Sequence, residues 1–168
     1  MLHITTTALT ELPLIHELGK QTFYPTYLPF ITKAQVDYMF HKMYDLPALQ
    51  QQVTERKHTF LLARLDKRPV GFISYEKDIN AERACKVHKL YVLPGTQGHG
   101  IGKALLDRVM LDGLAAGQQS IWLNVNRFNK AVEFYKHLGF EIVAEDDIDI
   151  GHGFYMNDYE MKKTLSAG

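Results

Sequence analysis

The sequence predicts an α/β fold in which a mixed, mostly antiparallel sheet is flanked by helices. Two strand-like runs, residues 60–65 and 70–75, are separated by a short polar turn, which is typical of an antiparallel hairpin. A third run, residues 85–93, leads through a glycine turn into a segment with apolar residues at helical spacing. A strand that returns after such a helix pairs in parallel with the strand before it, so the sheet is expected to be mixed.

The first third of the chain is predicted to be mainly helical. A β-branched run at residues 4–7 favours a short strand, and apolar residues at helical spacing follow it. Pro25 and Pro29 are expected to end the first helix, because proline removes a backbone donor. Thr32 resembles a cap before a second helix, and residues 46–53 are predicted to add a third.

The last third is predicted to alternate strand and helix. Residues 120–125 are expected to form the strand after the glycine-turn helix, and a helix is expected to begin at Asn129 and to stop at Gly139. Residues 141–144 and 153–162 are expected to be the last two strands, with a loop between them.

Composition limits the class of protein. The 168 residues are 46% apolar, which is enough for one domain with a full core, and 19 basic residues balance 19 acidic ones. This balance argues against a nucleic-acid partner. A single cysteine and the lack of an apolar run long enough to cross a bilayer favour a cytoplasmic protein without a membrane partner. The eight histidines lack the spacing of metal ligands, so we expect no metal.

The glycine turn is a candidate phosphate site. Gly98, Gly100 and Gly102 remove side chains at the start of a helix, where backbone N–H groups and the helix dipole attract anions. A P-loop is excluded because Lys103 is followed by Ala104 rather than by Ser or Thr. A glycine turn without a ligand is the alternative for this stretch alone.

Two stretches together resemble a known family. Gln97, Gly100 and Gly102 match a Gln/Arg-x-x-Gly-x-Gly/Ala pattern, and a later block carries an asparagine, an alanine, a tyrosine and a Gly-Phe pair at Asn129, Ala131, Tyr135, Gly139 and Phe140. In this order they resemble the two best-known motifs of the GCN5-related N-acetyltransferase (GNAT) superfamily. The resemblance covers roughly residues 58–162 and is weak before them.

The resemblance implies the acyl-CoA N-acyltransferase fold, with about six or seven strands and a V-shaped splay between the two central ones. It implies one domain over residues 1–168, with acceptor-side helices at about 8–55 and an acetyl-CoA-binding core at about 58–162. By the same resemblance, the cofactor-binding residues are expected to be Leu90, Tyr91, Val92, Gln97, Gly98, His99, Gly100, Ile101, Gly102, Lys103, Asn129 and Tyr135.

The implied reaction is direct transfer of an acetyl group from acetyl-CoA to an amine. Tyr135 is expected to protonate the departing thiolate, although it could instead be an ordinary residue of the helix stripe. Cys85 is expected to be a core residue rather than a covalent catalyst. Glu76 and His88 are the candidate bases that could deprotonate the amine, and each could also be an ordinary strand residue.

The acceptor is expected to be a small-molecule amine, with a polyamine such as spermidine or spermine as the best candidate. Residues 145–149 form an acidic run that suits a polycation, and Tyr24, Tyr27 and Glu76 are candidate acceptor contacts. The segments 43–44 and 153–159 look similar to the bacterial PaiA-like polyamine acetyltransferase branch. The alternatives are an Nα-acetyltransferase of a protein terminus or amino acid, and an acyl-CoA sensor without turnover. A homodimer would be in keeping with the superfamily.

Overall fold

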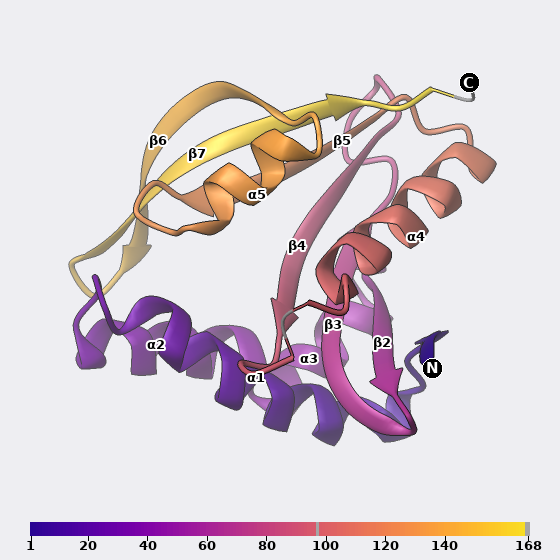
Figure 1. Cartoon of the computed structure of the whole chain (residues 1–168). Helices are drawn as coiled ribbons and strands as arrows, with labels where there is room; N and C mark the ends of the chain where they lie inside the picture. Colours follow the sequence, from indigo (N-terminus) through magenta and orange to yellow (C-terminus); the bar gives the residue numbers. More distant parts are fainter. Residues whose placement is uncertain (97, 167–168) are drawn as a thin grey trace. The chain divides into compact units, whose positions relative to one another are not determined.

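The computed structural model describes residues 1–96 and 98–166, and these residues fall into two compact units. The first unit comprises Met1–Glu76 and His88–Leu111, and the second comprises Lys77–Val87 and residues 112–166. One strand and one helix, which Figure 1 labels β4 and α4, contribute residues to both units. The expectation of one domain over the whole chain stays a prediction.

The first unit contains most of the helices. Its elements are β1 (Leu2–Thr6), the 3-10 helix η1 (Leu9–Glu11), α1 (Leu12–Tyr27), α2 (Lys33–Tyr44), α3 (Leu46–Thr54), β2 (Thr59–Leu65), β3 (Arg68–Glu76), the second part of β4 (Ala84–Val92) and most of α4 (Ile101–Ala115). The second unit contains the start of β4, the end of α4, β5 (Ser120–Asn126), α5 (Ala131–His137), β6 (Glu141–Gly151) and β7 (Phe154–Thr164).

The strands follow the hydrogen-bonded order β1-β2-β3-β4-β5-β7-β6. The pairs β1–β2, β2–β3, β5–β7 and β6–β7 are antiparallel, and β4–β5 is parallel. The predicted mixed, mostly antiparallel sheet is therefore confirmed. The parallel register joins Ala84–Val87 to Ser120–Leu123 within the second unit. The splay beyond this register stays a prediction.

The first helix continues through Pro25, so the prediction that this proline ends it was wrong. Leu28 N–H donates to the Tyr24 carbonyl at 3.0 Å, and Tyr27 is buried. Packing of the aromatic side of α1 therefore outweighs the loss of one backbone donor. Gly19 permits this packing, because a Cβ there would lie only 2.5 Å from the ring of Tyr44 on α2.

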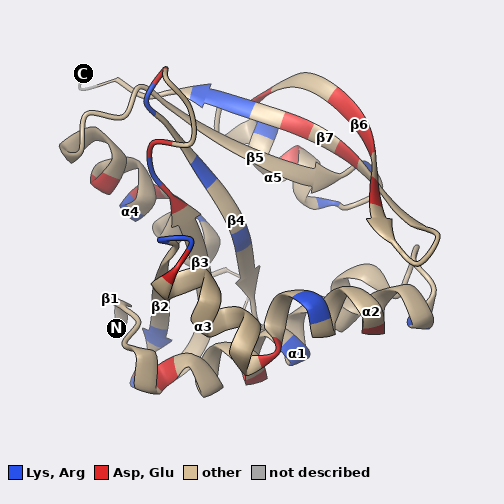
Figure 2. Cartoon of the chain, turned by 180° about the vertical axis from the view of Figure 1, so that it is seen from behind, with Lys and Arg blue, Asp and Glu red and all other residues tan. Residues whose placement is uncertain are grey.

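The acidic run predicted to lie in a loop belongs to a strand, so that prediction was also wrong. β6 runs from Glu141 to Gly151, and its register with β7 pairs Asp146 with Asp158 and Asp147 with Asn157. The turn comes later, at residues 151–153, where all three backbones have positive φ. Figure 2 shows the resulting run of acidic residues along β6.

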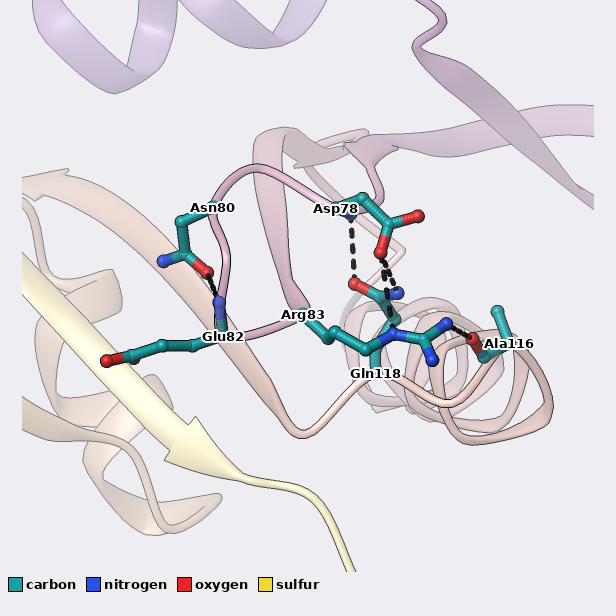
Figure 3. Close-up of polar contacts among 6 residues, drawn as sticks. All are labelled: Asp78, Asn80, Glu82, Arg83, Ala116 and Gln118. Carbon is teal, nitrogen blue, oxygen red and sulfur yellow. Dashed lines mark hydrogen bonds and ion pairs between the residues drawn. The ribbon is translucent and has the colours of Figure 1, made fainter.

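The loop between β3 and β4 is fastened to the C-terminal end of α4 inside the second unit (Figure 3). Asp78 N–H donates to the Gln118 side-chain oxygen at 3.0 Å, and the Gln118 amide donates back to the Asp78 carboxylate at 2.7 Å. Arg83 donates to the Ala116 carbonyl at 2.7 Å. Buried Gln118 thus holds the chain just before β4 begins.

None of the helices in the described ranges is both long enough and apolar enough to cross a membrane.

Candidate functional site

The glycine turn has the backbone that a phosphate cradle requires. Gly98 and Gly100 have φ values of +89° and +64°, which L residues rarely adopt, and α4 begins immediately afterwards at Ile101. A Cβ at either glycine would meet no described atom within 4 Å. Their backbone is therefore open to a ligand at a helix N-terminus. Gly102 differs, because it lies inside the helix.

The remaining residues of the turn have distinct surroundings. Ile101 is buried and begins the apolar stripe that was predicted for α4, whereas His99 is exposed. Lys103 is exposed and donates to the Asp107 carboxylate at 2.7 Å, one helical turn further on. Gln97, the first residue of the predicted motif, lies outside the described residues.

The C-terminal part of β4 packs closely against β3. Leu93 N–H donates to the Val70 carbonyl at 2.8 Å, and a Cβ on Gly71 would lie 3.0 Å from the Tyr91 carbonyl oxygen. The Val92 side chain would lie 3.3 Å from the same Cβ. Gly71 of β3 thus lies directly against the backbone at residues 90–92, which the family resemblance assigns to the pantetheine arm.

The two candidate acceptor tyrosines have hydroxyl groups engaged in different contacts. Tyr24 donates to the Asp37 carboxylate at 2.6 Å, and burial together with this bond raises the pKa of Tyr24 to about 12. Tyr27 is buried, and its hydroxyl lies 3.0 Å from that of Tyr91. Tyr24 therefore links α1 to α2, and Tyr27 links α1 to β4.

Glu76 and His88, the two candidate bases, are direct neighbours. His88 Nε2 lies 2.9 Å from Glu76 Oε1, and His58 Nε2 lies 3.6 Å from the same oxygen. The rings of His58 and His88 stack with their centroids 4.1 Å apart and their planes 9° apart. No sequence pattern had indicated His58 as a site residue, although it immediately precedes Thr59, which pairs with Tyr75 beside Glu76.

These three side chains also form a group of potential metal ligands among the described residues, with ligand atoms within 4.8 Å of one another. A metal lies close to the plane of each imidazole that binds it. Because the planes of His58 and His88 are nearly parallel and stacked, one ion cannot lie in both. The arrangement therefore favours hydrogen bonding over metal binding, and the expectation of no metal stays a prediction.

Asn129 and Tyr135 belong to the second unit. The Asn129 side-chain oxygen accepts a hydrogen bond of 2.9 Å from Ala131 N–H, which fixes the start of α5. Tyr135 is buried and contacts Phe140 edge to face at 5.6 Å. Phe140 N–H donates to the Tyr135 carbonyl at 3.0 Å beyond Gly139, which confirms the predicted glycine stop. That these residues meet the cofactor stays a prediction.

Two buried groups of the second unit bear on the chemistry. Cys85 is buried, and burial raises the pKa of its thiol to about 11, so it is poorly suited to act as a nucleophile. Asp158 is also buried, its Oδ1 has no hydrogen-bond partner among the described residues, and burial raises its pKa to about 6. No sequence pattern had indicated Asp158 as a site residue, and it is recognised by its register opposite Asp146.

Comparison with known proteins adds family information to this geometry. A family model described as an acetyltransferase (GNAT) domain matches residues 27–163. An uncharacterized N-acetyltransferase of Mycobacterium tuberculosis is 33% identical over 116 residues, which cover 68% of this chain and 72% of that protein. The ribosomal protein bS18 alanine N-acetyltransferase of Haemophilus influenzae is 34% identical over 64 residues, covering 38% of this chain and 40% of that protein.

Solved structures share the fold at lower identity. The PaiA N-acetyltransferase of Thermoplasma acidophilum in complex with coenzyme A has a TM-score of 0.81 at 22% identity, covering 98% of this chain and 99% of that one. The ribosomal protein S18 alanine N-acetyltransferase of Escherichia coli has a TM-score of 0.74 at 18% identity, covering 100% and 96%. These structures confirm the acyltransferase fold that the motifs implied.

Proposed function

Because the chain belongs to the GNAT family and is an acetyl-CoA-dependent N-acetyltransferase, we propose that it acetylates a primary amine of a small polyamine such as spermidine or spermine. The observation that carries the choice of acceptor is the acidic β6–β7 hairpin with its buried carboxylate, Asp158. The fold shared with a PaiA N-acetyltransferase supports the same choice.

The acetyl-CoA site is proposed at the residues that the family motifs name. The N–H groups of residues 97–103 would hold the pyrophosphate, and the positive φ values of Gly98 and Gly100 support this role. The backbone at residues 90–92 would hold the pantetheine arm in the manner of an added strand. Asn129 and Tyr135 would contact the arm and its sulfur. The complex of the Thermoplasma PaiA protein with coenzyme A supports this ligand.

The acceptor site is proposed along the acidic hairpin. Asp146 and Asp158 lie opposite each other on β6 and β7, and further carboxylates follow at Asp147 and Asp149. Like charges at directly opposite positions are unfavourable in a sheet unless a cation offsets them. Arg127, which pairs with Asp147 at 2.9 Å, acts in this sense on Asp158, and a bound ammonium group would add to its effect. Asp158 Oδ1 needs a donor, and an ammonium group supplies both the hydrogen bond and the charge. A polyamine carries several such groups, which a monoamine lacks.

The chemistry requires a neutral amine. Its nitrogen attacks the thioester carbonyl carbon, a C–N bond forms, and the C–S bond breaks, so that a thiolate leaves. An alkylamine with a pKa near 10.4 is neutral in only about one molecule in 2,500 at pH 7, at a cost of about 4 to 5 kcal/mol. A base therefore has to accept the amine proton. Tyr135 is proposed to protonate the thiolate.

A second candidate acceptor is the α-amino group of a protein or amino acid. It is favoured by the 34% identity to the bS18 alanine N-acetyltransferase over 64 residues. An α-amine with a pKa near 8 is neutral far more often, at a cost of only about 1 to 1.5 kcal/mol at pH 7. The two candidates thus differ in charge and in their need for a base.

The experiment is an acceptor panel in which CoA release is followed with a thiol reagent. Spermidine, spermine, butylamine and a short peptide with an N-terminal alanine are compared at equal acetyl-CoA concentration. We expect kcat/KM to be at least about tenfold higher for the polyamines than for butylamine, because a second ammonium group gains a charged contact. Turnover of the peptide with none of either polyamine would exclude the polyamine proposal. A cytoplasmic location and a homodimer stay predictions.

A further inference from the structure

We infer that the second unit holds a binding site for a free α-amino acid at the end of β7, apart from the proposed acceptor site. A pocket of about 560 Å³ opens there, which is within the usual range for small-molecule sites. Its walls come from the β3–β4 loop, the start of β5 and the end of β7, which all belong to this unit. Thr164 in its wall follows Asp158 by six residues, which corresponds to about 20 Å along an extended strand.

Backbone hydrogen bonds hold the walls of this pocket together. Gln119 N–H donates to the Arg83 carbonyl at 2.8 Å, and Leu165 N–H donates to the Gln119 carbonyl at 2.9 Å. The Arg83 guanidinium anchors the same loop, because it donates to the Ala116 carbonyl at 2.7 Å. The pocket is therefore formed before a ligand binds, which reduces the entropy that binding costs.

Ser120 presents a hydrogen-bond donor to the pocket. It lines the pocket although only 5% of it is exposed, and its side-chain oxygen accepts a hydrogen bond of 2.9 Å from the Trp122 indole. The hydroxyl proton of Ser120 is therefore available to an acceptor, and none of the described residues accepts it. A buried donor without an acceptor costs free energy, and a ligand oxygen in the pocket would remove this cost.

Lys162 adds a positive charge to the same pocket. Its register partner on β5 is Trp122, and its ammonium group lies 5.0 Å from the centroid of the indole ring. Within the described part of the chain Lys162 forms no ion pair, although Glu141 is its register partner on β6. An ammonium group and a hydroxyl that both lack an acceptor suit a carboxylate, because its two oxygens accept several hydrogen bonds.

Glu82 supplies the opposite charge. Figure 3 shows its side chain extending away from that of Arg83, and Glu82 lines the pocket together with Lys162. Its backbone N–H donates to the Asn80 side chain at 2.9 Å, which fixes the turn that carries it.

The two charges of the pocket together select the class of ligand. The Glu82 carboxylate and the Lys162 ammonium group line one pocket but form no ion pair with each other. A simple anion would be repelled by Glu82, and a simple amine would be repelled by Lys162. An α-amino acid carries a carboxylate for Lys162 and Ser120 and an ammonium group for Glu82, so it satisfies all three groups.

The test uses the fluorescence of Trp122, which is the only tryptophan of the chain. L-Alanine is titrated without acetyl-CoA, so that no turnover contributes to the signal. Its two matched analogues are propionate, which lacks the ammonium group, and ethylamine, which lacks the carboxylate. We expect a saturable change with alanine, at a dissociation constant at least about tenfold below that of either analogue, because each charged contact adds affinity.

Substitutions on the two sides of the pocket identify which ligand group each residue binds. In Glu82→Gln, alanine should bind no more tightly than propionate, because its ammonium group no longer meets a carboxylate. Lys162→Met should weaken the binding of both alanine and propionate about tenfold. Binding to this variant is measured by calorimetry, because removal of the ammonium group near the indole changes the fluorescence by itself.

Neighbouring charges of the same unit provide matched controls. Lys163→Met removes the next ammonium group of β7, which donates to the Leu138 carbonyl at 2.6 Å, and Glu141→Gln removes the register partner of Lys162. Neither variant should change the affinity for alanine. Thermal unfolding verifies that each variant is folded, and Lys162→Gln replaces Lys162→Met if the latter does not fold.

Two results would overturn the inference. One is a fluorescence change that rises linearly with alanine and does not saturate. The other is binding of propionate or inorganic phosphate as tightly as alanine, which would indicate a site for simple anions. Because binding is measured without acetyl-CoA, neither result bears on the proposed function. A protein that binds alanine but acetylates no amine would overturn the proposed function and support this inference.

Discussion

The side-chain oxygen of Gln52 accepts a hydrogen bond of 2.8 Å from the ammonium group of Lys89. Only 4% of Lys89 is exposed, and its Nζ lies 5.3 Å from the ring centre of Tyr44 and 5.7 Å from that of Phe60. The Gln52 amide donates in turn to the Met43 carbonyl at 3.0 Å. One buried cation thus connects β4 to α3 and to the end of α2.

This buried lysine should make folding stability depend on pH. Burial lowers the pKa of Lys89 to about 7, below the value of about 10.4 for an unfolded chain. Between these values the unfolded state binds more protons, so the contribution of Lys89 to stability increases as pH rises from 7 toward 10. Urea unfolding at pH 7 and pH 9.5 should show this increase in wild type but not in Lys89→Met. An equal increase in both proteins would contradict the prediction.

Substitution of Gln52 should show how much folding stability is lost when Lys89 has no hydrogen-bond acceptor. We expect Gln52→Leu to lower the free energy of unfolding by about 1 to 3 kcal/mol at pH 7, and by much less in a Lys89→Met background. The matched control is Gln51→Leu, because Gln51 is exposed and donates to Glu55 at the C-terminal end of the same helix. If the loss is the same with and without Lys89, the hydrogen bond is not its cause.

The fold was largely predictable because the local sequence signals for turns and helix ends agree with the observed strand pairing. The turn with positive φ at Asp66 and Lys67 joins β2 to β3, and the glycine stop at Gly139 ends α5, as polar turn residues and glycine indicate. The acidic strand was not predictable in the same way. Carboxylates at residues 145–149 disfavour a strand locally, and only pairing with β7 keeps them in one.

The backbone conformation of the glycine turn was predictable, whereas contacts between side chains from distant segments were not. The positive φ values of Gly98 and Gly100 could be expected because both residues are glycines. In contrast, His58 stacks on His88, which lies 30 positions further along the chain, and Lys89 on β4 donates a hydrogen bond to Gln52 on α3. Neither pair leaves a spacing pattern in the sequence, because contacts between elements depend on register and packing.

Gly71 should control how well the chain binds acetyl-CoA. In Gly71→Ala the new Cβ would lie 3.0 Å from the Tyr91 carbonyl oxygen, which is backbone and cannot rotate away. We expect β4 to shift and KM for acetyl-CoA to rise about tenfold, because the pantetheine arm is proposed to bind there. The control is Gly113→Ala, whose nearest atom is the flexible end of Leu165 at 3.2 Å. Unchanged coenzyme A affinity in Gly71→Ala would contradict this prediction.

Tyr135→Phe should separate chemistry from packing. The ring of Tyr135 contacts Phe134 and Phe140, and phenylalanine retains these contacts while it removes the hydroxyl. We expect kcat to fall by about 100-fold with KM for acetyl-CoA and the melting temperature nearly unchanged, since a general acid acts only in the transition state. Steady-state kinetics and thermal unfolding of the same preparation measure both. Full activity in the variant would remove Tyr135 from the proposed mechanism.

Asp158→Asn should affect stability and acceptor binding in separate pH ranges. Burial raises the pKa of Asp158 to about 6, above the value of about 3.9 for an unfolded chain, so the folded state binds more protons between these values. The contribution of Asp158 to stability therefore decreases as pH rises from 4 to 6. Asparagine does not titrate, so the variant should lack this decrease in urea unfolding at pH 4 and pH 6.5.

The same variant tests the acceptor site at pH 7.5. An ammonium group that binds Asp158 loses its charged partner in Asp158→Asn, so KM for spermidine should rise about tenfold while KM for acetyl-CoA and kcat/KM for butylamine stay the same. Glu141→Gln removes an exposed carboxylate from the start of β6 and should change none of these values. Equal losses with spermidine and butylamine would show that Asp158 supports the fold of the hairpin and does not bind a second ammonium group.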